Sequence, residues 1–174
     1  YLITVLPLIG FLINGLFGTK IKNEKVSGII GSLMVLGSFI MTVLAYLHIT
    51  SLPVEGRSIT IPLFNWITSG TLNISAAYLV DPLSVTMCLI ITGVGFLIHV
   101  YAIGYMHGDK GFARFFAFLN LFIFAMLNLV LGDNMLLMFL GWEGVGLCSY
   151  LLIGFFYEKK FAGYLTIADS IKED

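Results

Sequence analysis

Long apolar runs alternate with short polar segments along most of the chain. A helix needs roughly 20 apolar residues to cross the hydrocarbon core of a bilayer, which is about 30 Å thick. Five runs meet or approach this length: Tyr1–Gly18, Val26–Ile49, Pro82–Met106, Phe115–Leu131 and Asn134–Tyr157. The predicted fold class is therefore an all-α integral membrane protein with about five transmembrane helices.

A different pattern fills the connection between the second and third predicted helices, at about residues 50–81. Residues 57–67 and 71–78 alternate apolar and polar positions, and residues 68–70 (Thr-Ser-Gly) supply turn chemistry between them. Pro62 is typical of an exposed edge strand. We therefore expect a short β-hairpin here, on the outer side of the membrane.

Two of the predicted helices begin with residues that favour helix starts. Asp81 can cap free backbone N–H groups, and Pro82 is favoured at the first helical position. Asp133 and Asn134 lie in a very tight turn between the last two predicted helices. These two helices are therefore expected to pack antiparallel, and capping is the expected role of Asp81 and Asp133.

Composition supports the membrane assignment: 59% of the residues are hydrophobic and 11% are charged, with a mean hydropathy of +0.99. Soluble domains carry about 45–50% apolar and about 25% charged residues, so a soluble globular enzyme is excluded. The balance of 9 Lys and Arg against 10 Asp and Glu excludes a nucleic-acid binder. Cys88 and Cys148 lie in apolar runs, which indicates packing rather than a crosslink.

The basic residues predict how the chain is oriented in the membrane. All but Arg57 fall between the first and second helices, between the third and fourth, or after the fifth. Short loops rich in Lys and Arg stay on the cytoplasmic or equivalent side. The prediction is an N-terminus outside and the residues after the fifth helix inside. The residues on the predicted inner side are Lys20, Lys22, Lys25, Lys110, Arg114, Lys159, Lys160 and Lys172.

Glu143 is the one acidic residue in the middle of a predicted span, and none of the five spans contains a Lys or Arg. A charge at the bilayer centre costs about 2.5–3.5 kcal/mol on insertion scales, so such residues usually serve a function. Gly144 and Gly146 leave space beside it for a close helix or for water. Proton or ion handling by Glu143 is the favoured interpretation. The alternative is a neutral glutamate that holds helices together by hydrogen bonds.

Other intramembrane polar residues are weaker candidates. His99, near the inner end of the third predicted helix, can relay protons as an imidazole, or it can be a packing residue. Asn120 and Asn128 are interpreted as hydrogen-bonding to neighbouring helices. The sequence contains no cysteine cluster, no histidine pair at ligand spacing and no dinucleotide glycine fingerprint. We therefore expect no metal and no bound cofactor.

The fifth predicted helix carries the motif GWEGVGLCSY at Gly141–Tyr150, which is long and specific. Shorter motifs precede it at Leu6–Phe11 (LPLIGF), Asp81–Ser84 (DPLS), Thr92–His99 (TGVGFLIH) and Arg114–Ala117 (RFFA). Over roughly residues 1–163 the chain resembles the antiporter-like chain 5, or subunit L, family of respiratory complex I (NADH:quinone oxidoreductase).

The resemblance implies part of a proton-translocating membrane subunit, driven by quinone reduction elsewhere in an enzyme complex. Glu143 matches a protonatable glutamate of the family's proton half-channel, whose lysine partner lies on a later helix. The resemblance implies that the subunit carries no redox cofactor. It also implies other complex I membrane subunits, the lipid bilayer and the downstream helices of the same subunit as partners, with no nucleic acid. The implied location is a bacterial plasma membrane or a mitochondrial inner membrane.

The family pattern also suggests how the chain is divided. Residues 1–106 would hold the first three helices and the hairpin, and residues 107–163 would begin the antiporter-like module. Residues 164–174 form a short polar tail that departs from the family, and Tyr1 is not a methionine. We therefore expect an N-terminal portion of the subunit, inactive by itself.

Two other functions remain open. One is a subunit of an Mrp-type cation/proton antiporter, which uses a related glutamate without NADH chemistry. The other is a membrane scaffold that transports nothing, in which Glu143 only forms hydrogen bonds.

Overall fold

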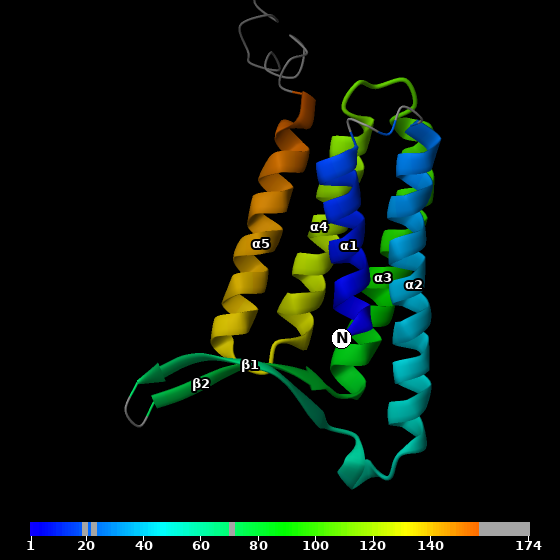
Figure 1. The fold of residues 1–174 in the computed structure, drawn as a ribbon. Helices are drawn as coiled ribbons and strands as arrows, with labels where there is room; N and C mark the ends of the chain where they lie inside the picture. The colour runs from blue at the N-terminus through cyan, green and yellow to red at the C-terminus, as the bar shows by residue number, and fades with distance from the viewer. Residues whose placement is uncertain (19–20, 22–23, 70–71, 157–174) are drawn as a thin grey trace, which may run out of the picture.

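Five helices and a two-stranded hairpin make up the part of the chain that the computed structural model describes, residues 1–18, 21, 24–69 and 72–156 (Figure 1). Each helix begins within three residues of its predicted start; the largest difference is in α4, predicted from Phe115 and found from Phe112. The helices are α1 (Leu2–Phe17), α2 (Glu24–Ser51), α3 (Pro82–Tyr105), α4 (Phe112–Leu131) and α5 (Met135–Ile153). Single 3-10 turns, η1 (Val54–Gly56) and η2 (Gly154–Phe156), follow α2 and α5.

Four of these helices are long and apolar enough to cross a membrane: α2, α3, α4 and α5 extended by η2. The first helix, α1, is also apolar but has 16 residues, which gives a length of about 24 Å at 1.5 Å per residue. The prediction of an all-α membrane protein with about five helices is confirmed, with a first helix that is shorter than a full span.

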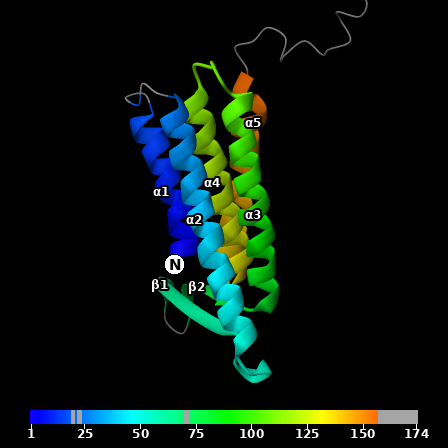
Figure 2. The ribbon, with the colours of Figure 1, turned by 90° about the vertical axis from the view of Figure 1, so that its right-hand side faces the viewer.

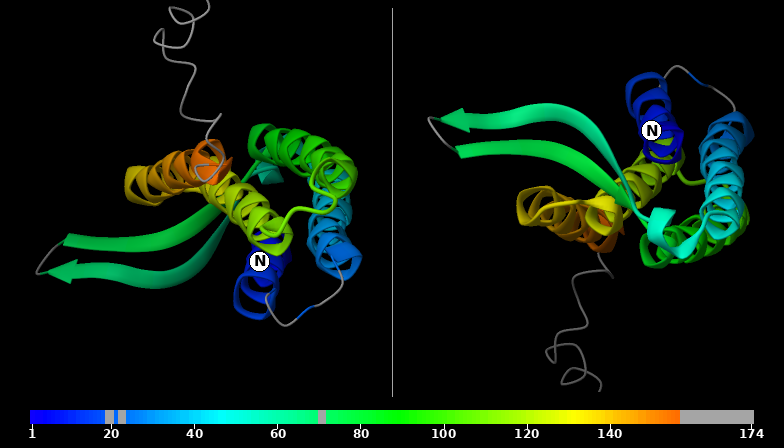
Figure 3. Two further views of the ribbon diagram at one scale, coloured as in Figure 1. Left: turned by 90° about the horizontal axis from the view of Figure 1, so that it is seen from above. Right: turned by 90° about the horizontal axis from the view of Figure 1, so that it is seen from below.

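α4 lies at the centre of the bundle and contacts each of the other four helices (Figure 3). α2 packs between α1 and α3 and turns small residues inward, while its large aliphatic side chains point outward. Small residues let helix backbones approach closely in a membrane, where lipid already satisfies large apolar side chains. The inward residues of α2 include Ser27, Gly28, Gly31, Ser32, Ser38 and Thr42, and the outward ones Ile29, Leu33, Ile40, Leu44 and Leu47.

The predicted hairpin is present as β1 (Ile59–Ser69) and β2 (Leu72–Val80), which pair antiparallel. The register shifts twice, between Pro62 and Phe64 and between Asn65 and Ile67. The hairpin runs beneath one end of the helices and projects past them (Figures 1 and 3). We call this end of the bundle the hairpin end. Of the predicted turn, Gly70 lies outside the described residues.

Hydrogen bonds tie the hairpin to the α4–α5 turn and to the start of α1. Asn134 donates from Nδ2 to the carbonyl of Ser75 over 2.7 Å and caps α5 by accepting from the backbone N–H of Leu137 over 3.0 Å. The hydroxyl of Tyr1 donates to the carbonyl of Pro62 over 2.7 Å. These bonds anchor the hairpin to the helices of the bundle.

The predicted cap of α3 is also present, whereas α5 is capped by Asn134 and not by the predicted Asp133. The Asp81 carboxylate accepts from the backbone N–H of Ser84 over 2.7 Å, and the Ser84 hydroxyl accepts from the backbone N–H of Asp81 over 2.9 Å. Both cysteines, Cys88 and Cys148, are free and buried, as their interpretation as packing residues predicts.

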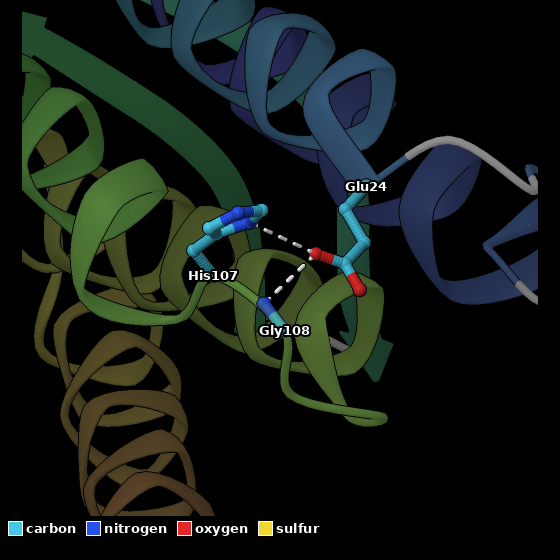
Figure 4. A network of polar contacts seen from close by, with 3 residues as sticks. All are labelled: Glu24, His107 and Gly108. Atoms are coloured by element: carbon cyan, nitrogen blue, oxygen red, sulfur yellow. Dashed lines mark hydrogen bonds and ion pairs between the residues drawn. The ribbon is translucent and has the colours of Figure 1, made fainter.

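At the opposite end of the bundle α2 and α4 begin (Figure 2). Three basic residues, Lys25, Lys110 and Arg114, lie in or next to the starts of these helices, and we call this end the basic end. Here the start of α2 is joined to the loop after α3 (Figure 4). Oε2 of Glu24 accepts the backbone N–H of Gly108 over 3.0 Å and lies 3.4 Å from Nδ1 of His107. Gly108 has a φ of 81°, a conformation that glycine adopts without a steric penalty.

Candidate functional site

Glu143 lies near the middle of α5, with eight helical residues before it (135–142) and ten after it (144–153). Its side chain is exposed, and so are its neighbours Trp142 (68%) and Tyr150 (76%). A Cβ atom built at Gly146 would have no atom of the described residues within 4 Å. Among the described residues, Glu143 has no hydrogen-bond or ion-pair partner. The face of α5 that carries Glu143 is thus uncovered by the described helices.

Two glycines on the other face of α5 set this orientation. A Cβ atom at Gly141 would lie 2.5 Å from the backbone nitrogen of Leu129, and one at Gly144 would lie 3.0 Å from the Cβ of Ala125. Both neighbours belong to α4. The glycines therefore let α5 approach α4 closely along one line, which turns Glu143 outward.

His99 occupies a different place, in the interior between α3 and α4, where 1% of its surface is exposed. Its Nδ1 lies 2.7 Å from the carbonyl oxygen of Gly95, which can only accept, so Nδ1 carries the hydrogen. Its Nε2 lies 3.3 Å from Nδ2 of Asn120 and accepts from that amide. The hydrogen-bond network thus assigns a neutral imidazole with the proton on Nδ1.

Asn120 connects His99 to the rest of the interior. It is 0% exposed, and its Nδ2 also donates to the carbonyl of Phe116 over 2.9 Å. Both amide hydrogens are therefore used. Within the described part of the chain its Oδ1 has no hydrogen-bond partner and lies against Gly10 of α1. A side chain at Gly10 would occupy the position of this oxygen.

A second asparagine, Asn14 of α1, lies on the same side of α2. Its Oδ1 accepts from the hydroxyl of Ser27 over 2.7 Å, and its Nδ2 has no partner among the described residues. A Cβ atom at Gly31 would lie 2.8 Å from Nδ2 of Asn120 and 3.1 Å from Nδ2 of Asn14. Polar side chains from α1, α2, α3 and α4 therefore meet inside the bundle, and we call Asn14, Ser27, His99 and Asn120 the polar cluster.

α5, which carries Glu143, and the polar cluster lie on opposite sides of α4. The α4 residues against α5 are Ala125 and Leu129, whereas Asn120 points to α3. At 100° per residue, Leu129 stands about 180° around the helix from Asn120. The two sequence-predicted site residues, Glu143 and His99, are thus not brought together by the described helices.

The interpretation of Asn120 as a bond to a neighbouring helix is confirmed, and Asn128 has a partner that the sequence did not indicate. Its Oδ1 accepts from the hydroxyl of Tyr78 in β2 over 2.6 Å. Burial raises the pKa of Tyr78 above its usual value of 10.0. Asn128 therefore bonds the hairpin rather than a second helix.

Comparison with known proteins gives two matches to protein families. Residues 66–116 match the family described as NADH-ubiquinone oxidoreductase (complex I), chain 5 N-terminus. Residues 132–167, which include Glu143, match the NADH:quinone oxidoreductase/Mrp antiporter transmembrane family.

Curated relatives give the same result over more of the chain. It is 48% identical to NADH-quinone oxidoreductase subunit L of Escherichia coli strain K12 over 155 residues, 88% of this chain and 24% of that protein. It is 46% identical to subunit L of Pseudomonas aeruginosa over 157 residues, 90% of this chain and 25% of that protein. For subunit L of Rickettsia typhi the identity is 42% over 161 residues, 92% of this chain and 24% of that protein.

The chain thus belongs to the antiporter-like membrane proteins of the NADH:quinone oxidoreductase and Mrp type. Within that class its matches are to chain 5, or subunit L, of NADH-quinone oxidoreductase. It spans about a quarter of the length of these relatives.

Proposed function

We propose that this chain is part of a proton-translocating subunit of the membrane arm of NADH:quinone oxidoreductase, in which Glu143 gains and loses a proton. The observation that carries the proposal is the exposed carboxylate in the middle of α5. Ionisable groups at this depth almost always face a partner, a water-filled cavity or the interior of a bundle. The uncovered face of α5 is therefore where further protein or water meets Glu143.

His99 is a second candidate, as a proton relay. Its Nε2 lone pair is occupied by the Asn120 amide, so protonation of His99 requires that amide to turn. The same amide is also bonded to the carbonyl of Phe116. A relay role for His99 therefore requires both hydrogen bonds of this amide to break. Glu143 is the stronger candidate of the two.

The proposed orientation places the basic end of the bundle on the inner side of the membrane. Lys25, Lys110 and Arg114 are at that end, and Arg57 follows η1 at the hairpin end. This distribution follows the positive-inside rule. The N-terminus, which lies near the hairpin (Figure 1), is then outside.

The proposed role of Glu143 is tested by its carboxyl vibration in the full-length protein. Difference infrared spectra between about pH 5 and pH 9, the range that buried carboxylates reach, should contain a carboxyl band that disappears in Glu143→Gln. The matched variant Glu55→Gln, on an exposed residue of η1, should retain it. A Glu143 that stays protonated over the whole range contradicts proton transfer and favours the scaffold.

An Mrp-type antiporter subunit is the other candidate, because the family that matches residues 132–167 includes both kinds of protein. The genes next to the one that encodes this chain distinguish them. Other complex I subunits there support the first proposal, and small antiporter subunits support the second.

A further inference from the structure

A cavity of about 1130 Å³ opens at the basic end of the bundle, between α1, the start of α4 and η2. It is separate from Glu143, which faces away from α4, and of the polar cluster Asn14 is among its described lining residues. Pockets of about 300–1,000 Å³ hold whole drug-sized ligands. The volume is therefore much larger than a free inorganic anion fills.

The cavity has an apolar wall along the helices and a charged rim. The wall is built by α1 and α4 and includes Phe11, Leu12, Leu16, Ala117 and Phe118. The rim carries the exposed side chains of Lys110 and Arg114. This division suits a ligand with one anionic end and one long apolar end.

The two cations at the rim are available to such a ligand. Within the part of the chain that the structure describes, neither Lys110 nor Arg114 forms an ion pair. The guanidinium carbon of Arg114 lies 5.0 Å from the ring centre of Phe155, which holds the side chain at the cavity. Among the described residues that line the cavity, Asp109 is the one acidic residue, and its Oδ1 accepts the backbone N–H of Gly111 over 2.9 Å.

The first turn of α4 adds to the positive potential at the rim. Its N-cap is Gly111, which has no side chain to bond the free N–H groups of the helix start. The N-terminus of a helix carries a partial positive charge and favours anions. Lys110, Arg114 and this helix start thus surround one side of the same cavity.

We propose that the cavity binds an anionic phospholipid, with the phosphate at Lys110 and Arg114 and an acyl chain along the wall of α1 and α4. Basic pockets between transmembrane helices on the inner side of a membrane are suited to anionic lipid headgroups. The site lies at the end of apolar spans, where a phospholipid changes from headgroup to chain. This proposal does not depend on proton transfer by Glu143.

The test measures lipid bound to the full-length protein in detergent, by native mass spectrometry during titration with phosphatidylglycerol, phosphatidylcholine or inorganic phosphate. The wild type should bind phosphatidylglycerol in preference to phosphatidylcholine. The double variant Lys110→Gln/Arg114→Gln should bind it about 30-fold more weakly, since each basic residue near the headgroup contributes to the attraction. The charge-conserving pair Lys110→Arg/Arg114→Lys should retain binding.

The apolar wall is tested separately with Gly15→Leu, because Gly15 lines the cavity and a Cβ atom there meets its neighbours at ordinary distances of 3.8 and 4.0 Å. This variant should lose phosphatidylglycerol although both cations remain. Two variants outside the cavity, Arg57→Gln and Gly104→Leu, should bind as the wild type does; in the described part of the chain, a Cβ atom at Gly104 meets nothing within 4 Å.

Three results overturn the proposal. The first is equal binding of the two lipids, or binding that none of the cavity variants changes. The second is displacement of phosphatidylglycerol by inorganic phosphate, which identifies a simple anion site. The third is a wild type that binds no phosphatidylglycerol, as expected if another segment of the protein fills the cavity. All three results concern lipid binding alone, so none of them tests the role of Glu143.

Discussion

Asn120 of α4 donates an amide hydrogen to Nε2 of His99 on α3 across 3.3 Å, in the interior of the bundle. Both side chains are fully buried, and the second amide hydrogen of Asn120 is bound to the carbonyl of Phe116. The bond joins two helices and fixes the tautomer of the histidine.

Replacing Asn120 with leucine should destabilise the protein, because the change fills a similar space but leaves Nε2 of His99 without a donor. A buried polar atom without a partner costs about 1–3 kcal/mol. The free energy of unfolding of the full-length protein, measured in mixed micelles with a denaturing detergent, checks this. Asn65→Leu, on an exposed residue of β1, should change it by less than about 0.5 kcal/mol. Equal effects of the two variants would show that the interior bond contributes nothing.

Tyr78→Phe should weaken the attachment of the hairpin to α4, because it removes the hydroxyl that donates to Asn128 over 2.6 Å. The expected loss of stability is about 1–3 kcal/mol, since the Asn128 oxygen is left buried without a donor. The free energy of unfolding of the full-length protein, measured in the same mixed micelles, checks this. Tyr46→Phe is the matched control, because that hydroxyl lies on a partly exposed residue of α2.

The same tyrosine should give the stability a dependence on alkaline pH. Burial raises the pKa of Tyr78 in the folded protein above its usual value of 10.0. The unfolded chain therefore releases this proton first, so the contribution is complete below about pH 10 and decreases as the pH rises further. Tyr78→Phe should remove this part of the decrease. An unchanged pH profile in the variant would be evidence against burial of the hydroxyl.

Gly141→Ala should disturb the contact between α5 and α4. The added Cβ atom would lie 2.5 Å from the nitrogen and 2.6 Å from the Cα of Leu129, and backbone atoms cannot turn away. Overpacking of this kind costs about 1–3 kcal/mol. Gly146→Ala on the same helix meets no atom of the residues that the structure describes within 4 Å and should be neutral or stabilising by up to about 1 kcal/mol, because alanine favours helices. The readout is the change in unfolding free energy that each substitution causes. A Gly141→Ala protein as stable as the wild type would contradict the packing.

Much of this fold follows from the apolar pattern, because the length of an apolar run sets where a membrane helix begins and ends. The side on which each helix packs does not follow from it. In α2 the inward residues are small, such as Gly31 and Ser38, and the outward ones are large, such as Leu33. Lipid accepts both the small and the large aliphatic residues of α2, so hydrophobicity alone does not distinguish its two faces.

The sequence indicates single residues of the candidate site but not the contacts between them. Glu143 can be recognised in the sequence because it is a charged residue within an apolar span, and this needs no knowledge of its neighbours. The polar cluster depends on four helices that meet, and the sequence contains no local sign that Asn14 and Asn120 lie on either side of Gly31. Its single-residue signals, His99 and Asn120, suggest polar contacts without giving their partners. The outward orientation of Glu143 likewise depends on Gly141 and its contact with α4.

The central claim is that Glu143 carries a translocated proton. The most direct test introduces Glu143→Gln into the full-length subunit within its membrane complex and measures protons translocated per NADH oxidised. With normal assembly, the ratio should fall clearly below that of the wild type, while Glu55→Gln leaves it unchanged. A Glu143→Gln complex that assembles and translocates protons at the wild-type ratio would contradict the claim.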